Sequence, residues 1–262
     1  MAFLIPSRQA RRPLRRLALL ALLAALLAPA LGAAARTGEP EHVFLPMVWK
    51  NYRPVAPGLP IDPYATHRGE GTYYAATGAG NCSFPAQSGS PLLVAAMNNP
   101  DYNSALYCGA FVEGTGPLGS VIVQIVDRCP ECAAGDLDFS VAAFDRIARR
   151  QDGRVPISWR VVSPALSGPI RYHFKEGSHQ WWMGVQIRNH RNPVFKFEYR
   201  NSAGSFVAVP RQSYNYFVIE NAGVGPFTFR VTDFYGNVLT DSGIPLLADN
   251  SAPGAAQFPP QQ

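Results

Sequence analysis

Apolar and polar residues alternate along two stretches of the C-terminal half. Residues 195–200 read Phe-Lys-Phe-Glu-Tyr-Arg, and residues 227–232 read Phe-Thr-Phe-Arg-Val-Thr. A period of two is typical of strands that bury one face. Gly236-Asn237, shortly after the second stretch, predicts a hairpin turn. Short strands joined by turns favour a β-sandwich over residues 170–247.

The N-terminal half carries two apolar runs with an amphipathic stretch between them. Val121–Val126 and Ile157–Val162 predict buried strands. Between these runs, apolar residues recur at helical spacing; they are Val141, Phe144, Ile147 and Ala148. Ser140 is a suitable N-cap, and Asp152-Gly153 is expected to end the helix. We therefore predict a mainly β domain with one crossover helix over residues 66–165.

The two ends of the chain differ from this body. Five arginines precede the apolar run Leu17–Leu31, so residues 1–35 are predicted to be a cleaved signal peptide, with an uncleaved anchor as the alternative. Residues 36–65 contain six prolines and are expected to form an extended linker. Within it, Val43–Tyr52 is apolar enough to pack on the body or to associate with a surface. Residues 248–262 are rich in Pro, Ala and Gln, which predicts a largely irregular tail.

Net charge is informative only after the signal peptide is set aside. The full chain has 23 Lys/Arg and 18 Asp/Glu, but five of the arginines lie in residues 1–35. The remainder is balanced, with 18 of each, and lacks the basic footprint that nucleic-acid binding requires. Residues 170–247 hold eight basic and five acidic residues, so this part either assists in holding an anionic polymer or is an ordinary solvated surface.

The four cysteines are Cys82, Cys108, Cys129 and Cys132. An even number in an exported chain favours disulfides, for which three pairings are possible. A zinc site at the Cys-Pro-Glu-Cys segment is the alternative. It would need a second ligand pair, and the spacing of Cys82 and Cys108 does not resemble one. We expect no metal and no cofactor.

Two acidic residues lie where a functional group is expected. Asp127 ends a predicted strand, and Asp138 follows a loop that contains a glycine. Binding and catalytic groups tend to lie where strands run into loops, although an exposed turn with solvated acids has the same pattern.

The segment around these acids resembles the signature of expansin-type double-psi β-barrels. The motifs are Val126-Asp-Arg-Cys-Pro-Glu-Cys132 and Gly135-Asp-Leu-Asp-Phe-Ser140. Downstream, Lys175-Glu-Gly-Ser178, Trp181-Trp182 and Tyr214-Asn215 resemble the second domain of bacterial expansins, an immunoglobulin-like, cellulose-binding module. The likeness covers roughly residues 66–259. It implies a six-stranded double-psi β-barrel followed by an immunoglobulin-like β-sandwich.

The resemblance also implies which residues bind glycan. Thr72, Asp127 and Asp138 would line the barrel groove, and Asp138 would be the residue most needed for activity. Tyr74 stands where a second threonine is usual, and Cys129 stands where a tyrosine is common. The family further implies that the cysteines pair as Cys82–Cys108 and Cys129–Cys132.

The same comparison places a glycan-binding surface in the second domain. Trp181, Trp182 and Tyr214 are expected to stack on the C–H faces of glucose units. Neighbours on a regular strand point to opposite faces, so both tryptophans can face one glycan only at a bulge or turn. Lys175 either reaches a sugar hydroxyl or an anionic group, or is simply a solvated strand residue.

A single acid does not make a glycosidase, because hydrolysis ordinarily needs a second carboxylate. The opening strand, Thr72-Tyr-Tyr-Ala75, offers none, and Glu70 is expected at its entrance. Asp127 is expected to raise the pKa of Asp138 by like-charge proximity. We therefore predict a non-hydrolytic activity in which Asp138 disturbs contacts between wall polymers.

The sequence thus predicts a secreted, monomeric expansin-like protein that loosens a cell wall. Its expected partners are cellulose, xyloglucan or other plant wall glycans, with peptidoglycan as a further candidate. Neither a nucleic acid nor a membrane span is expected. The enzymatic alternative is a lytic transglycosylase or a weak endoglucanase that uses Asp138 as the acid. A third interpretation is passive polysaccharide binding, with the barrel as scaffold only.

Overall fold

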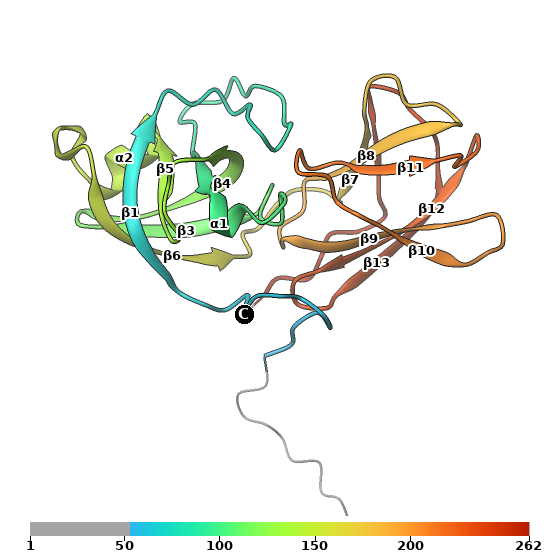
Figure 1. The fold of residues 1–262 in the computed structure, drawn as a ribbon, viewed down its shortest axis with the longest axis horizontal. Helices are drawn as coiled ribbons and strands as arrows, with labels where there is room; N and C mark the ends of the chain where they lie inside the picture. The colour runs from blue at the N-terminus through green and yellow to red at the C-terminus, as the bar shows by residue number, and fades with distance from the viewer. Residues whose placement is uncertain (1–52, 262) are drawn as a thin grey trace, which may run out of the picture. The chain divides into compact units, whose positions relative to one another are not determined.

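A computed structural model describes residues 53–261 (Figure 1). The predicted signal peptide and the apolar segment Val43–Tyr52 lie outside the described residues. The described chain is mainly β, as the sequence predicts, with a closed barrel followed by two further sheets.

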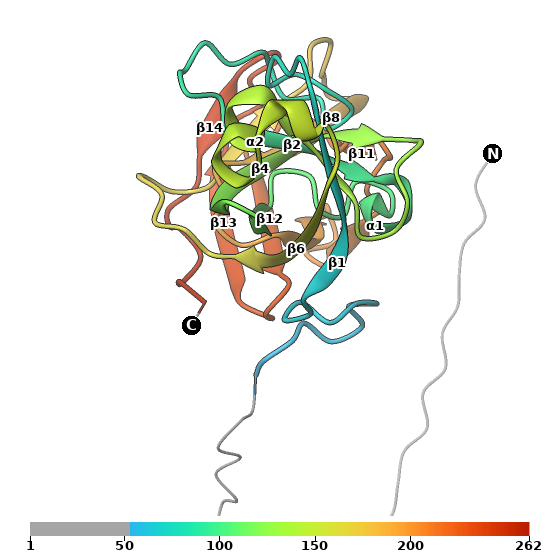
Figure 2. The ribbon, with the colours of Figure 1, turned by 90° about the vertical axis from the view of Figure 1, so that its left-hand side faces the viewer.

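The first body is a closed barrel of six strands. Its strands are β1 (His67–Tyr74), β2 (Val94–Asn98), β3 (Phe111–Gly116), β4 (Gly119–Cys129), β5 (Leu137–Ser140) and β6 (Val155–Val162). They close in the order β1-β5-β2-β4-β3-β6. The pairs β1/β5 and β2/β4 are parallel and the other four are antiparallel. Figure 2 shows β1 and β6 side by side along the barrel wall.

Helices α1 (Asn99–Tyr102) and α2 (Val141–Ile147) and the 3₁₀ turn η1 (Arg150–Asp152) accompany the barrel. The predicted amphipathic helix is present, and it buries Ala143, Phe144 and Ile147. It ends earlier than expected, because η1 occupies the residues before Gly153. Ser140 is the N-cap residue, but its hydroxyl does not cap the helix. It donates instead to the carbonyl oxygen of Leu92 at 2.6 Å.

The second body is a sandwich of two four-stranded sheets. Its strands are β7 (Arg171–Phe174), β8 (Trp182–Arg188), β9 (Val194–Arg200), β10 (Phe206–Val209), β11 (Phe217–Glu220), β12 (Phe227–Asp233), β13 (Val238–Ile244) and β14 (Ser251–Pro253). One sheet has the order β10-β9-β12-β13 and the other β11-β8-β7-β14. The expected turn at Gly236 joins β12 to β13, and its φ of +84° favours glycine. Alternation holds on β12, where Phe227, Phe229 and Val231 are buried.

Two segments that the sequence describes as irregular pack on the folded bodies. Residues 251–253 form β14, which pairs with β7, and Phe258 is only 1% exposed in the sandwich core. The described part of the proline-rich linker contains no strand, but Leu59 and Ile61 pack against the barrel core. Its backbone is also tied down, since the Ala56 N–H donates to the Phe234 carbonyl at 2.8 Å. Burial of a few apolar side chains therefore holds both segments against the folded bodies, although their overall composition predicts irregular chain.

Between Arg53 and Gln261, no helix is long and apolar enough to cross a membrane.

Candidate functional site

Asp138 lies where β5 runs parallel to β1. The register sets it opposite Thr72, and the Thr72 hydroxyl donates to Asp138 Oδ1 at 2.6 Å. Both side chains line a hollow of about 110 Å³, which also receives Glu131, Arg154 and the Cys129–Cys132 disulfide. The strand pairing therefore brings together two predicted groove residues that are 66 positions apart in the chain.

Burial raises the pKa of Asp138 above its ordinary value, because desolvation disfavours the charged carboxylate. The hydrogen bond from Thr72 opposes this shift by favouring the ionised form. Glu131 and then Asp127 raise the pKa further by like-charge repulsion. The predicted contribution of Asp127 is therefore present, but it is smaller than those of burial and of Glu131.

Two other carboxylates at this hollow have structural partners. Glu70 Oε2 accepts a hydrogen bond from Arg154 Nη1 at 2.5 Å. Asp136 accepts the backbone N–H groups of Glu70 at 2.7 Å and Ala133 at 3.0 Å, which fixes the loop before β5. Both carboxylates are thus engaged in holding the rim of the hollow.

Glu131 differs from these two. It is exposed, it lines the hollow, and the described residues provide it with neither an ion pair nor a side-chain hydrogen bond. The sequence interpretation assigned it no role. Its position between two bridged cysteines is the signal that could have identified it, because a disulfide that spans three residues constrains the backbone of the turn between them.

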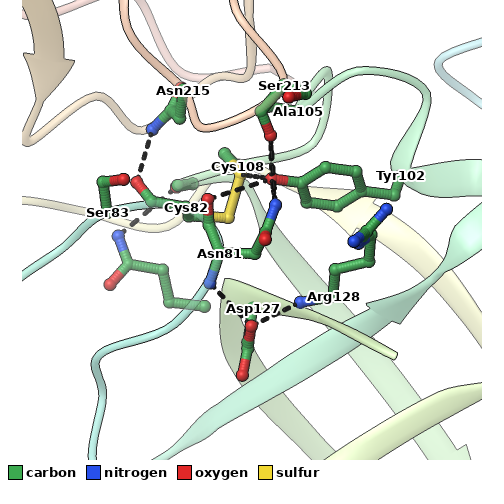
Figure 3. The surroundings of a disulfide bond; sticks show 12 residues. Asn81, Cys82, Ser83, Tyr102, Ala105, Cys108, Asp127, Arg128, Ser213 and Asn215 are labelled. Atoms are coloured by element: carbon green, nitrogen blue, oxygen red, sulfur yellow. Dashed lines mark hydrogen bonds between the residues drawn. A yellow bond between two sulfur atoms is a disulfide. The ribbon is translucent and has the colours of Figure 1, made fainter. Parts of the chain in front are cut away.

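Asp127 serves as a backbone anchor. Its Oδ1 accepts the N–H of Asn81 at 2.6 Å and that of Arg128 at 2.8 Å (Figure 3). The chain passes so close that a Cβ at Gly80 would lie 2.3 Å from Asp127 Cγ, so only glycine fits there. One oxygen of this carboxylate is therefore committed to holding the loop that carries Cys82.

This loop joins the barrel to the sandwich. Asn81 Nδ2 donates to the Ser213 carbonyl at 3.1 Å, and the Tyr102 hydroxyl donates to the same oxygen at 2.8 Å (Figure 3). From the sandwich, Gln186 Nε2 and Asn215 Nδ2 donate to the Cys82 carbonyl at 2.9 Å and 3.2 Å. A hydrogen-bonded path thus leads from Asp127 to the residue that precedes Tyr214.

Both disulfides that the resemblance implies are present. Cys82–Cys108 spans 26 residues and is buried at this junction, whereas Cys129–Cys132 spans three and lines the Asp138 hollow. On the chain-entropy model the longer bridge contributes about 3–4 kcal/mol to stability. The described residues contain no free cysteine, so the zinc alternative at Cys129 and Cys132 has no thiolate ligands among them.

Tyr74, the departure from the family pattern, lies on β1 two residues beyond Thr72. Its hydroxyl is buried and has no hydrogen-bond partner among the described residues. Burial raises the pKa of Tyr74, and Asp127 and Asp138 add to the shift, so the phenol stays protonated. Tyr74 lines a different hollow from Asp138, so the structure does not bring its predicted glycan contact together with the Asp138 hollow.

Trp181 lies in a tight turn, which is one of the two geometries that would let Trp181 and Trp182 face the same glycan. The backbones of His179 and Trp182 pair across the turn, and Trp182 begins β8. His179 Nδ1 accepts the N–H groups of Trp181 and Trp182, each at 3.2 Å, which stabilises the turn. The Trp181 side chain is 64% exposed, whereas Trp182 is only partly exposed.

The other two predicted contacts of the second domain have distinct surroundings. Tyr214 is 37% exposed, and its ring centroid is 6.0 Å from that of Tyr216. Lys175 Nζ lies 5.5 Å from the Tyr216 ring centroid, a cation–π contact within the protein. Lys175 therefore already has an aromatic partner in the free protein.

Comparisons with known proteins agree with this architecture. A family model described as lytic transglycolase matches residues 66–159. The chain is 36% identical over 203 residues to Expansin-YoaJ of Bacillus subtilis (strain 168), which covers 74% of this chain and 87% of that protein. A crystal structure of the Clavibacter michiganensis expansin aligns with a TM-score of 0.68 and 33% identity, covering 75% of this chain and 99% of that one. A mutant of that expansin in complex with cellohexaose aligns equally well.

Proposed function

Because the chain belongs to the expansin family, we propose that it binds cellulose and related wall glycans and loosens the wall without hydrolysing it. The support for a cellulosic ligand is the cellohexaose complex of the Clavibacter michiganensis expansin mutant. Xyloglucan is a second ligand to test, because it shares the glucan backbone. Asp138 and Thr72 contact the glycan in the barrel, and Trp181, Trp182 and Tyr214 stack on it in the sandwich.

The observation that carries this proposal is the state of Asp138. It is a half-buried carboxyl, hydrogen-bonded to Thr72, with a pKa raised by burial. Its neighbours Glu70 and Asp136 are held by other groups. Asp138 in a small polar hollow can exchange hydrogen bonds with sugar hydroxyls. Hydrolysis ordinarily needs a second carboxylate, and Glu131 is the carboxylate of the hollow for which the described residues provide no partner.

The test compares wild type with Asp138→Asn on cellulose and xyloglucan. We expect extension of isolated walls by the wild type alone and no soluble sugars from either protein by mass spectrometry. Soluble cello-oligosaccharides released only by the wild type would contradict the non-hydrolytic mechanism.

Glu131 supports a second candidate function, cleavage of a glycosidic bond. It lines the Asp138 hollow and is free of the partners that hold Glu70 and Asp136. The family model for the barrel is moreover described as lytic transglycolase. In this alternative, Asp138 donates its proton to the leaving glycosidic oxygen, and Glu131 accepts the proton of the sugar's own 6-hydroxyl, which attacks the anomeric carbon and closes the anhydro ring. Release of anhydro-muropeptides from peptidoglycan, lost in both Asp138→Asn and Glu131→Gln, would favour it.

Secretion forms part of the proposal. Its support is the arginine-rich and apolar character of residues 1–35. Two disulfides in a chain of this size also fit an oxidising compartment. Mass spectrometry of the N-terminus of the protein recovered from culture medium tests it, and an intact Met1 in that fraction would contradict cleavage.

A further inference from the structure

Three hollows on the outer wall of the barrel run into one another. The largest, of about 490 Å³, shares Thr66 and Arg160 with a second of about 200 Å³. The second shares Thr115 and Ser158 with a third of about 290 Å³. We call this continuous depression the outer furrow. It follows β6, whose eight residues span about 25 Å, so it suits an extended polymer better than a small molecule.

The outer furrow is separate from the glycan site described above. None of its lining residues belongs to the Asp138 hollow. Thr66 immediately precedes β1 and Arg68 is its second residue, whereas Thr72 and Tyr74 lie at its end, roughly 20 Å along the strand. A polymer in the outer furrow and a glycan at Asp138 can thus be bound by one molecule at the same time.

The charge of the outer furrow is positive. Arg160 pairs with Glu113 at 2.6 Å, and Glu113 is the one acidic side chain among the described residues that line it. Arg53 and Arg68 also line it, and within residues 53–261 no carboxylate forms an ion pair with either. Two guanidinium groups therefore remain to bind an external anion, and their planar donor geometry matches a carboxylate.

The remaining side chains suit a sugar. Tyr64 and Tyr235 line the largest hollow, with ring centroids 5.4 Å apart, and Arg53 stacks on Tyr64 at 4.9 Å. Tyr235 is only 4% exposed and Arg53 covers Tyr64, so these rings form the floor of the hollow, and the nearby hydroxyls are the groups that can exchange hydrogen bonds with sugar hydroxyls. Such hydroxyls line the whole furrow; they belong to Thr66, Thr115, Ser158 and Ser163. Two unmatched charges over about 25 Å are too few for a duplex nucleic acid, which carries a charge every ~1.7 Å.

We propose that the outer furrow is a second polysaccharide-binding site, which takes an acidic glycan such as a uronate polymer. One molecule then holds two different wall polymers, a neutral glucan at Asp138 and the sandwich, and an acidic strand along β6. This inference goes beyond the proposed function and does not depend on how Asp138 acts.

The test measures binding of the full-length secreted protein to polygalacturonate, to its fully methyl-esterified form and to cellulose. Arg53→Ala/Arg68→Ala should bind polygalacturonate about tenfold more weakly, because two charge-assisted contacts are lost. Its binding to cellulose should not change. The matched control is Arg146→Ala/Arg200→Ala, which removes the same charge from residues that line none of the three hollows. Labelled polygalacturonate should also be retained on cellulose only when the wild type is present.

Several outcomes would overturn the second site. Equal losses in the two double variants would mean that only net charge matters. Unchanged binding of the esterified polymer would exclude carboxylate recognition, and equal capture of polyglutamate would exclude a sugar site. Competition between polygalacturonate and soluble cello-oligosaccharide would mean that both use one site. Cellulose binding is measured separately, so its failure would count against the proposed function and not against the outer furrow.

Discussion

The two predicted glycan-binding surfaces, the Asp138 hollow and the Trp181 turn, differ in how far their key side chain is buried and held. Asp138 is half-buried between paired strands and has a hydrogen-bond partner 2.6 Å away. Trp181 is 64% exposed on a turn. A group locked by strand pairing and hydrogen bonding is suited to a step that needs precise placement. An exposed ring mainly supplies contact area. The two surfaces should therefore be separable, with activity depending on the hollow and affinity on the turn.

The largest effect is expected from Asp138→Asn. Asparagine keeps an oxygen that can accept from Thr72, so the fold should be unchanged, but the carboxyl proton is lost. Wall extension should be abolished, while cellulose binding changes by less than about twofold. Extensometry and pull-down on the same preparation measure the two quantities. The matched control is Asp145→Asn on α2, which should extend walls normally. Retained extension by a folded Asp138→Asn would refute the assignment.

Trp181→Ala should have the next largest effect, on affinity alone. Loss of a stacked ring should weaken cellulose binding by about tenfold. Trp182→Ala and Tyr214→Ala should lose less, because their side chains are less exposed than Trp181. Val238→Ala, an exposed apolar residue on β13, serves as the control. At saturating protein, Trp181→Ala should still extend walls. If it does not, the turn contributes more than affinity and the two surfaces are not separable.

A smaller effect is expected where the two regions are joined. Tyr102→Phe removes the hydroxyl that donates to the Ser213 carbonyl. The same hydroxyl also accepts from Asn81 Nδ2 at 2.9 Å, so two hydrogen bonds are lost and stability should fall by about 1–3 kcal/mol. Denaturant unfolding measures this change, and Tyr73→Phe, with a half-exposed ring, is the control. If unfolding of Tyr102→Phe splits into two transitions, the junction couples the bodies; an unchanged midpoint would mean that this contact contributes nothing.

The elements were predictable wherever the pattern is local. Alternation in residues 227–232 identified β12, and the stripe from Val141 to Ile147 identified α2. Such patterns report which face of an element is buried, and that information is contained in neighbouring residues. The ends of elements were less predictable. Ser140 has the composition of a cap, yet its hydroxyl bonds to Leu92, because a tertiary acceptor competes with the helix N-terminus.

The resemblance supplied the candidate residues of the site, but their hydrogen bonds could not be predicted. Family motifs selected Thr72, Asp138 and both disulfides. The anchoring of Asp127 to Asn81 depends on the close approach of Gly80, which only the folded chain reveals. Likewise β14 is three residues long, too short to show a period, and it exists because β7 offers a free edge. Contacts over long sequence separations are set by packing, and a single sequence does not encode them in any local pattern.

The smallest expected effect is on the pH dependence of stability, and it tests whether the hollow perturbs its acid. Burial raises the pKa of folded Asp138 above its ordinary value. At a pH between the ordinary pKa of an aspartate and the raised pKa of folded Asp138, the folded state holds a proton that the unfolded state has released. The protonated carboxyl therefore stabilises the fold at low pH, and this contribution is lost as pH rises through the folded pKa. Asp138→Asn lacks the titration, so its stability relative to wild type should rise with pH across that window.

Thr72→Val sharpens this test. The Thr72 hydrogen bond favours the ionised form, so its removal should raise the pKa of Asp138 further. The window in which wild-type-like stability is lost should then move to higher pH, whereas Thr228→Val, an exposed-strand control outside the hollow, should leave it in place. Thermal melts from pH 3 to pH 8 measure all four proteins. A shift of this window to lower pH in Thr72→Val would mean that the Thr72 hydroxyl stabilises the protonated form of Asp138 instead of the ionised form. The assigned direction of the Thr72–Asp138 hydrogen bond would then be wrong.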